Sequence, residues 1–165
     1  MKKNNSLPIF GVGPIYVLSC LVLTILGLIL NYRGYLEIGK VDKAKTLFVI
    51  FGFILIILGL YLWVKAVLIQ KINARVKDEM LITNGVYGIV RNPVYTSFIC
   101  IFTGILLFAK NYLLLVLPII FWIYLTILMK KSEEKWLKAK FGKEYDLYCK
   151  RVNRVIPWFP KKISN

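Results

Sequence analysis

Four long apolar runs alternate with short polar stretches along the chain. They cover residues 9–31, 47–69, 94–109 and 112–129. Because a helix of about 20 apolar residues crosses the hydrocarbon core of a bilayer, this pattern predicts four membrane-spanning helices. The third and fourth runs are shorter than the first two, and only Lys110 and Asn111 separate them. We expect these two spans to form a tight antiparallel hairpin.

The apolar pattern gives way near Lys130 to a basic tail with helical periodicity. Large apolar and aromatic residues recur there every three or four positions, at Leu137, Phe141, Tyr145, Tyr148 and Val152. This spacing predicts an amphipathic helix that lies at the membrane surface or covers the end of the bundle. Ser132 is expected to cap this helix, with Glu133 and Glu134 in its first turn.

Composition agrees with a membrane protein. Of the 165 residues 58% are hydrophobic, and the mean hydropathy is +0.66, above the range of ordinary soluble domains. The first run follows Lys2 and Lys3, as in a signal peptide, but it is long and lacks a small-residue cleavage pattern, so we expect a retained anchor. The expected fold is all-α and integral to the membrane, with about four transmembrane helices and a C-terminal amphipathic cytoplasmic helix.

Basic residues concentrate on one side of the predicted spans. The N-terminus, the 70–93 segment and everything from Lys130 onward carry 17 of the 23 Lys and Arg residues, against 4 in the 32–46 loop and 1 at Lys110. Short segments rich in Lys and Arg remain in the cytoplasm. We therefore expect a multi-pass protein of the cell membrane with both termini and the 70–93 segment in the cytoplasm.

The formal net charge of +15 raises the question of nucleic-acid binding. The charges mostly flank the spans and are interspersed with bulky apolar residues, which suits the anionic lipids of an inner leaflet better. We expect membrane lipids as partners, and no nucleic acid.

Histidine is missing from the sequence. This removes the commonest general base, the metal sites that contain histidine and the histidine-dependent triads. Cys20, Cys100 and Cys149 lie far apart without metal-type spacing, so we expect no metal site. Any chemistry must use carboxylates, Arg, Lys, Tyr and the backbone.

The stretch LITNGVYGIVRNPVYTS, residues 81–97, has an unusual polar composition for a segment between two spans. Gly85 permits a backbone shape or a close approach that a side chain would block, and Pro93 disfavours helical geometry at the preceding residue. A guanidinium, an amide and two phenols stand around this turn, at Arg91, Asn92, Tyr87 and Tyr95. They could enclose a polar, partly aromatic ligand, or they could be an ordinary interfacial anchor.

Glu133 and Glu134 also allow two interpretations. They can be no more than helix-starting residues. However, they follow the fourth span at its predicted cytoplasmic exit, which is the level of the 81–97 stretch.

The segment LITNGVYGIVRNPVY, then a helical hairpin, then EEKWLKAKFGKEYDLYCKRVNRVIP, resembles the isoprenylcysteine carboxyl methyltransferase family and its bacterial and phospholipid-methyltransferase relatives. Those proteins show a Gly-x-Tyr turn leading into Arg-His-Pro or Arg-Asn-Pro and Tyr, and later Glu-Glu, Phe-Gly, Tyr and Ile-Pro. The resemblance covers residues 80–158. It divides a single membrane domain, 1–165, into an N-terminal two-span region, 1–79, and a methyltransferase motif region, 80–158.

The resemblance implies a membrane-embedded methyltransferase outside the Rossmann class. Such an enzyme takes S-adenosyl-L-methionine from the cytosol and a lipophilic or lipid-like acceptor from the bilayer. One implied wall of the cofactor site is formed by Gly85, Tyr87, Arg91, Asn92, Pro93 and Tyr95. The other is formed by Glu133, Glu134, Tyr145 and Tyr148. The implied catalytic residues are Arg91 and Glu133.

Two positions depart from the family pattern. Asn92 stands where the eukaryotic members usually have histidine; it can form hydrogen bonds but cannot titrate near neutral pH. Met129 stands where members often carry an arginine that orients an acceptor carboxylate. The neighbouring Lys130 and Lys131 could supply a point charge, without the bidentate fork of arginine.

Two other function classes are open at this point. A small four-span transporter or a scaffolding protein would need no cofactor, although a coupled transporter would be expected to carry an ionisable residue at mid-membrane, and the first, third and fourth runs have none. A membrane reductase with a nicotinamide cofactor is the second alternative.

Overall fold

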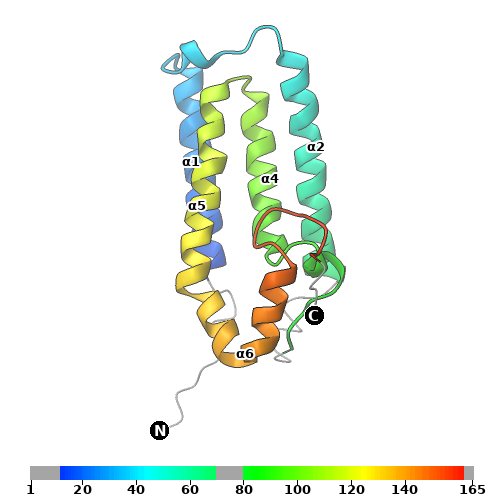
Figure 1. Cartoon of the computed structure of the whole chain (residues 1–165). Coiled ribbons are helices and arrows are strands. Elements are labelled where there is room, and N and C mark those ends of the chain that lie inside the picture. Colours follow the sequence, from blue (N-terminus) through cyan, green and yellow to red (C-terminus); the bar gives the residue numbers. More distant parts are fainter. Residues whose placement is uncertain (1–11, 70–79, 162–165) are drawn as a thin grey trace.

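Four helices stand side by side in the computed structural model, and a fifth folds back beneath them (Figure 1). The structure describes residues 12–69 and 80–161. The upright helices are α1 (Gly13–Tyr32), α2 (Lys45–Val64), α4 (Pro93–Phe108) and α5 (Val116–Lys131), and the last helix is α6 (Glu133–Arg151). No strand occurs within these described ranges. The predicted all-α membrane fold is confirmed.

Short helical turns extend or connect these elements. They are the 3-10 turns η1 (Glu37–Gly39), η3 (Gly85–Gly88) and η4 (Tyr112–Leu115), and the π-helical turn η2 (Lys65–Ile69). With their extensions, Lys45–Ile69 and Tyr112–Lys131 join Gly13–Tyr32 as helices long and apolar enough to cross a membrane. α4 is apolar but has only 16 residues.

α1, α2 and α5 each turn a narrow face inward and a wide apolar face outward, whereas α4 is more fully enclosed. In α1 the buried residues are Tyr16, Cys20, Thr24 and Gly27, which are spaced by one helical turn. Large apolar side chains such as Leu18, Val22 and Ile25 are exposed on the same helix. This arrangement fits helices surrounded by lipid, because apolar side chains are as favourable in contact with lipid tails as in a protein interior.

Glycines let α2 and α4 approach closely. A Cβ added at Gly104 would lie 2.6 Å from the carbonyl oxygen of Gly52, and one added at Gly59 would lie 2.7 Å from the carbonyl oxygen of Ser97. Both distances are too short for a side chain against backbone. Small residues at such crossings are the usual means of packing helices in a membrane.

The predicted hairpin between the last two spans is confirmed. Lys110 adopts a positive φ of 53° at its turn, and the next residue, Asn111, is fully buried. The Asn111 Nδ2 donates to Asn31 Oδ1 at 2.7 Å and to the Leu36 carbonyl at 2.7 Å. These bonds fasten the turn to the end of α1.

The predicted apolar stripe on α6 is confirmed, since Tyr145, Tyr148 and Val152 are buried together against Leu137 and Phe141. The helix is kinked at Gly142, where φ is 51° and ψ is −123°. This kink was not predicted, because the apolar periodicity continues across it.

The predicted capping by Ser132 is wrong. α6 begins at Glu133, but the Ser132 hydroxyl donates to the Leu128 carbonyl at 2.6 Å and makes no capping bond. The reason is that α5 ends immediately before this residue, so its side chain satisfies a carbonyl in the last turn of α5.

Candidate functional site

The two sequence regions singled out by their motifs meet at the lower end of the bundle. Arg91 N donates to the Asn153 carbonyl at 2.8 Å, and Asn92 Nδ2 donates to the Arg154 carbonyl at 3.0 Å. The Tyr148 hydroxyl donates to the Tyr87 carbonyl at 2.7 Å. The loop before α4 and the chain around the end of α6 therefore form one structure, as expected.

Local backbone chemistry shapes the loop. Gly85 has a φ of 60°, a conformation that glycine adopts without the strain of a side chain. Asn92 lies outside helical geometry, with φ −124° and ψ 62°, and Pro93 begins α4. Tyr87 is buried against Leu62 near the end of α2. Both the glycine and the proline expectations are confirmed.

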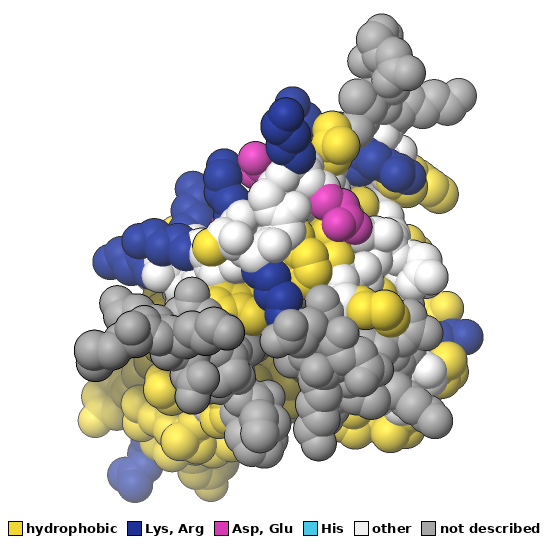
Figure 2. All heavy atoms as spheres, turned by 90° about the horizontal axis from the view of Figure 1, so that it is seen from below, with side chains coloured by type: hydrophobic (Ala, Val, Ile, Leu, Met, Phe, Trp, Pro, Cys, Tyr) yellow, Lys and Arg dark blue, Asp and Glu magenta, His cyan; other side chains and the backbone are white. Residues whose placement is uncertain are grey.

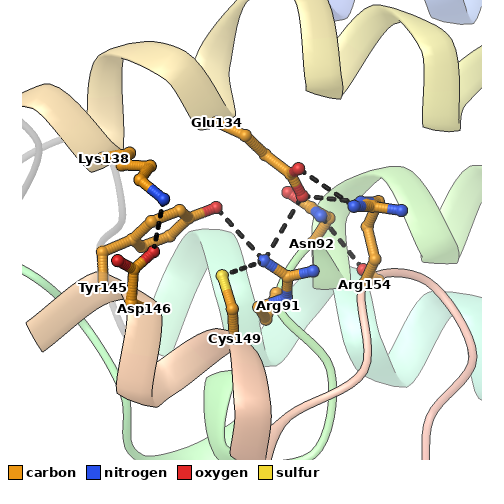
Figure 3. Close-up of polar contacts among 8 residues, drawn as sticks. All are labelled: Arg91, Asn92, Glu134, Lys138, Tyr145, Asp146, Cys149 and Arg154. Carbon is orange, nitrogen blue, oxygen red and sulfur yellow. Dashed lines mark hydrogen bonds and ion pairs between the residues drawn. The ribbon is translucent and has the colours of Figure 1, made fainter. Parts of the chain in front are cut away.

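An ion-pair cluster centres on the Glu134 carboxylate (Figure 3). Arg154 donates two hydrogen bonds to this carboxylate, from Nε to Oε1 at 2.6 Å and from Nη2 to Oε2 at 3.0 Å. Arg91 Nη1 lies 3.3 Å from Oε1. Two guanidinium groups thus share one carboxylate, so the cluster keeps a net positive charge.

Arg91 makes further contacts with α6. Its Nη1 donates to the Tyr145 hydroxyl at 3.2 Å and contacts Cys149 Sγ. Burial raises the pKa of the Cys149 thiol and of the Tyr145 hydroxyl, while the charge of Arg91 acts in the opposite direction on both pKa values. Both groups are therefore protonated at neutral pH.

One donor of Arg91 is not used. The side chain is only 9% exposed, and its Nε is buried without a hydrogen-bond partner among the described residues. A buried charged donor without a partner is costly. Arg91 Nε is therefore available to donate a hydrogen bond to an oxygen atom of a ligand.

Glu133 lies in a different environment from its neighbour. Its Oε1 accepts from the Tyr95 hydroxyl at 2.7 Å and from Val12 N at 3.3 Å. No ion pair joins it to another described residue. Burial raises the pKa of Glu133, and its two hydrogen bonds oppose the shift.

Aromatic residues connect this carboxylate to the bundle and to the loop. Tyr16 of α1 meets Tyr95 edge-on at a centroid distance of 5.8 Å. Burial raises the pKa of Tyr87, and the nearby Tyr148 and Glu133 raise it further. Tyr87 therefore lies within electrostatic reach of Glu133.

The ten expected site residues lie at this end of the molecule, but they divide into groups. Arg91, Glu134 and Tyr145 form the ion-pair cluster, and Glu133 with Tyr95 forms the second group. Tyr87 and Tyr148 are joined by a hydrogen bond. The remaining three, Gly85, Asn92 and Pro93, shape or fasten the loop.

Among the contributors not anticipated from the sequence are Arg154 and the Val12 amide. Arg154 is one of eleven basic residues from Lys130 onward, and no local pattern distinguishes it from the others. The Val12 amide is a backbone group at the start of α1. Only the folded chain reveals either contact.

The end of the molecule that carries the site is rich in charge (Figure 2). Lys and Arg side chains gather along one part of this face, over apolar and neutral groups, with few acidic side chains among them. An anionic ligand or anionic lipid is electrostatically favoured on such a face.

A sequence model of the phospholipid methyltransferase family matches residues 47–144, a range that begins in α2 and ends in α6. The chain is also similar to a protein-S-isoprenylcysteine O-methyltransferase of Schizosaccharomyces pombe, with 32% identity over 89 residues. The match covers 53% of this chain and 37% of that protein, so the chain spans little more than a third of its relative. No solved structure matches the chain.

Proposed function

The chain belongs to the phospholipid methyltransferase family, and on that premise we propose that it transfers a methyl group from S-adenosyl-L-methionine to a lipophilic acceptor from the bilayer. The observation that carries the proposal is the Arg91, Glu134 and Arg154 cluster, which lies at the junction of the two motif regions. A transporter or scaffolding role gains no support from the family match.

The residues at the site fit this cofactor. Its carboxylate requires a cationic partner, and the cluster has excess positive charge and a spare donor on Arg91 Nε. Its ammonium and hydroxyl groups require acceptors, which the Glu133 carboxylate and the tyrosine hydroxyls could provide. When bound, the cofactor supplies an electrophilic methyl group on a positively charged sulfur.

The two carboxylates are proposed to have different roles. Glu134 is neutralised by two arginines, so it is a positioning residue that holds Arg91 in place. Glu133 is partly buried without a described counter-charge, and this burial raises its pKa. It is therefore suited to accept a proton from a nitrogen, oxygen or sulfur nucleophile of the acceptor. A nucleophile that is already ionised would need only positioning and exclusion of water.

The acceptor is proposed to reach Glu133 from the lipid side. Tyr95 belongs to α4 and Tyr16 to α1, so the Glu133 group borders the spanning bundle. The cofactor is proposed to enter from the cytoplasm, and the concentration of Lys and Arg in the segments at this end supports a cytoplasmic orientation.

Calorimetric titration of the detergent-purified chain tests this proposal. S-adenosyl-L-methionine is expected to bind, and NADPH is not. Arg91→Lys keeps the charge but loses the fork, and we expect it to weaken binding about tenfold, since a hydrogen bond to a charged group is worth ~1.5–3 kcal/mol. The matched control is Arg151→Ala, which removes an exposed guanidinium at the end of α6. This variant should bind the cofactor like the wild type.

Thermal unfolding of each variant separates a binding defect from misfolding. Binding of NADPH alone, or equal affinity of folded Arg91→Lys and wild type for S-adenosyl-L-methionine, would remove the support for this site.

A further inference from the structure

The chain beyond α6 turns back toward the bundle. Val155 is buried in the same core cluster as Tyr16 and Phe121 of the spanning helices. Its carbonyl accepts a 2.8 Å bond from Thr96 Oγ1, in the first turn of α4. The last described segment accordingly runs beside the lower end of α4 (Figure 1). This segment therefore lies next to the first turn of α4, where that helix enters the bundle.

The backbone of this segment is fastened at both ends. Trp158 N donates to the Ile89 carbonyl at 3.2 Å, and Lys161 N donates to the Arg151 carbonyl at 2.9 Å. Its position is therefore set by contacts with the site loop and with the end of α6.

Its large side chains nevertheless point away from the protein. Phe159 is 86% exposed and Trp158 is 63% exposed, and Ile156 and Ile89 beside them are exposed as well. We call these four residues the C-terminal apolar patch. If water surrounded the patch, these large apolar side chains would stay hydrated, which is unfavourable.

The surroundings of the patch favour lipid as its occupant. Its segment is bonded to the first turn of a spanning helix and joins the core of a bundle whose outer faces are apolar. Exposed basic residues flank it at Arg151 and Lys161. Tryptophan with neighbouring cations is the typical composition of a membrane interface, where the ring lies at headgroup level and the cations meet lipid phosphates.

We propose that the C-terminal apolar patch is an interfacial anchor whose side chains insert at the boundary between headgroups and acyl chains. The same segment bonds to the backbone or side chains of Ile89, Arg91 and Asn92. Contact with lipid therefore holds the site loop at the membrane surface. This inference stands on the geometry of the segment, and it does not depend on methyl transfer.

Tryptophan fluorescence of the full chain in phosphatidylcholine and phosphatidylglycerol nanodiscs tests the anchor. The chain has four tryptophans, and substituting Trp63, Trp122 and Trp136 by Phe leaves Trp158 as the reporter. The matched control keeps only Trp136, which lies on α6. Lipids brominated near the headgroup end should quench Trp158 about twofold more than Trp136, with a blue-shifted Trp158 emission, if the ring is interfacial.

Two results would overturn the proposal. One is a Trp158 emission typical of water, quenched by aqueous iodide and not by brominated lipid. The other is a Trp158 shielded from both quenchers, which would indicate a protein partner in place of lipid. If the triple variant does not fold, the difference between wild type and Trp158→Phe gives the same comparison with a single substitution at an exposed site.

Discussion

Glu133 and Glu134 are neighbours in sequence but differ in charge environment. Arg154 and Arg91 surround Glu134, whereas Glu133 has only a tyrosine hydroxyl and a backbone amide as described partners. Successive residues of a helix point about 100° apart, so adjacent side chains can reach different neighbours. One carboxylate is therefore held by two guanidinium groups, whereas the other has no described counter-charge and its pKa is raised by burial.

The raised pKa of Glu133 predicts a pH dependence of stability. Burial lifts this pKa above its ordinary value of 4.5, so the folded state binds the proton more tightly than the unfolded state. The resulting stabilisation is complete below pH 4.5 and is lost as the pH rises through the folded-state pKa. Glu133→Gln resembles the protonated form, and we expect its thermal midpoint to fall less over this range than that of the wild type.

Differential scanning fluorimetry across pH measures this effect. Glu144→Gln, at an exposed position of the same helix, should reproduce the wild-type slope. If the thermal midpoint of Glu133→Gln changes with pH as much as that of the wild type, the prediction is contradicted. The Glu133 carboxylate would then be as well solvated in the folded chain as in the unfolded chain.

The parts of the site that were predictable from the sequence are those in which a residue acts on its own backbone. Gly85 and Pro93 act on their own backbone, so their effects were predictable and are confirmed. The ion pair of Arg154 with Glu134 joins residues 20 positions apart. It depends on how α6 and the segment after it fold back, which no local spacing records.

At the scale of elements, the kink of α6 decides whether the site assembles. The first half of the helix carries Glu133 and Glu134, and the second half carries Tyr145 and Cys149 toward Arg91. Between them Gly142 has a positive φ with ψ −123°, a combination that side chains disfavour strongly. A straight helix would carry the second half away from the loop.

Gly142→Ala tests the kink. A Cβ here would meet no atom within 4 Å, so the substitution acts through backbone strain alone. We expect a loss of about 1–3 kcal/mol in the free energy of unfolding, together with weaker cofactor binding as the second half of α6 moves. Chemical denaturation and calorimetric titration measure the two effects.

Lys143→Ala, at the exposed neighbouring position, is the control and should behave like the wild type. Equal stability and affinity of Gly142→Ala and wild type would mean that the kink is not needed for the site.

The elements themselves were largely predictable. Apolar runs of membrane length define spans without reference to tertiary contacts, and the four predicted runs correspond to α1, α2, α4 and α5 with their short extensions. Residues 9–11 of the first run lie outside the described residues. The Gly142 kink and the role of Ser132 were not predictable, because each depends on where the neighbouring segment lies in space.

On the scale of the whole molecule, polar contacts are concentrated at the two ends of an apolar bundle. Asn111 fastens the upper end through Asn31 and Leu36, and the site occupies the lower end. The lower end combines paired cations, a carboxylate without a described counter-charge and direct contact with spanning helices. These are the properties required of an enzyme that brings a charged cytosolic cofactor to a lipophilic acceptor.

The central claim is methyl transfer itself, and a labelling experiment tests it most directly. Membranes containing the full chain are incubated with S-adenosyl-L-methionine labelled in its methyl group and then extracted with organic solvent. We predict a labelled lipophilic product with wild type and with Glu144→Gln, and a loss of label of about tenfold or more with Arg91→Ala, because the charged contact to the cofactor is removed. Wild-type membranes that bind the cofactor yet yield no more extractable label than membranes lacking the chain would contradict the account.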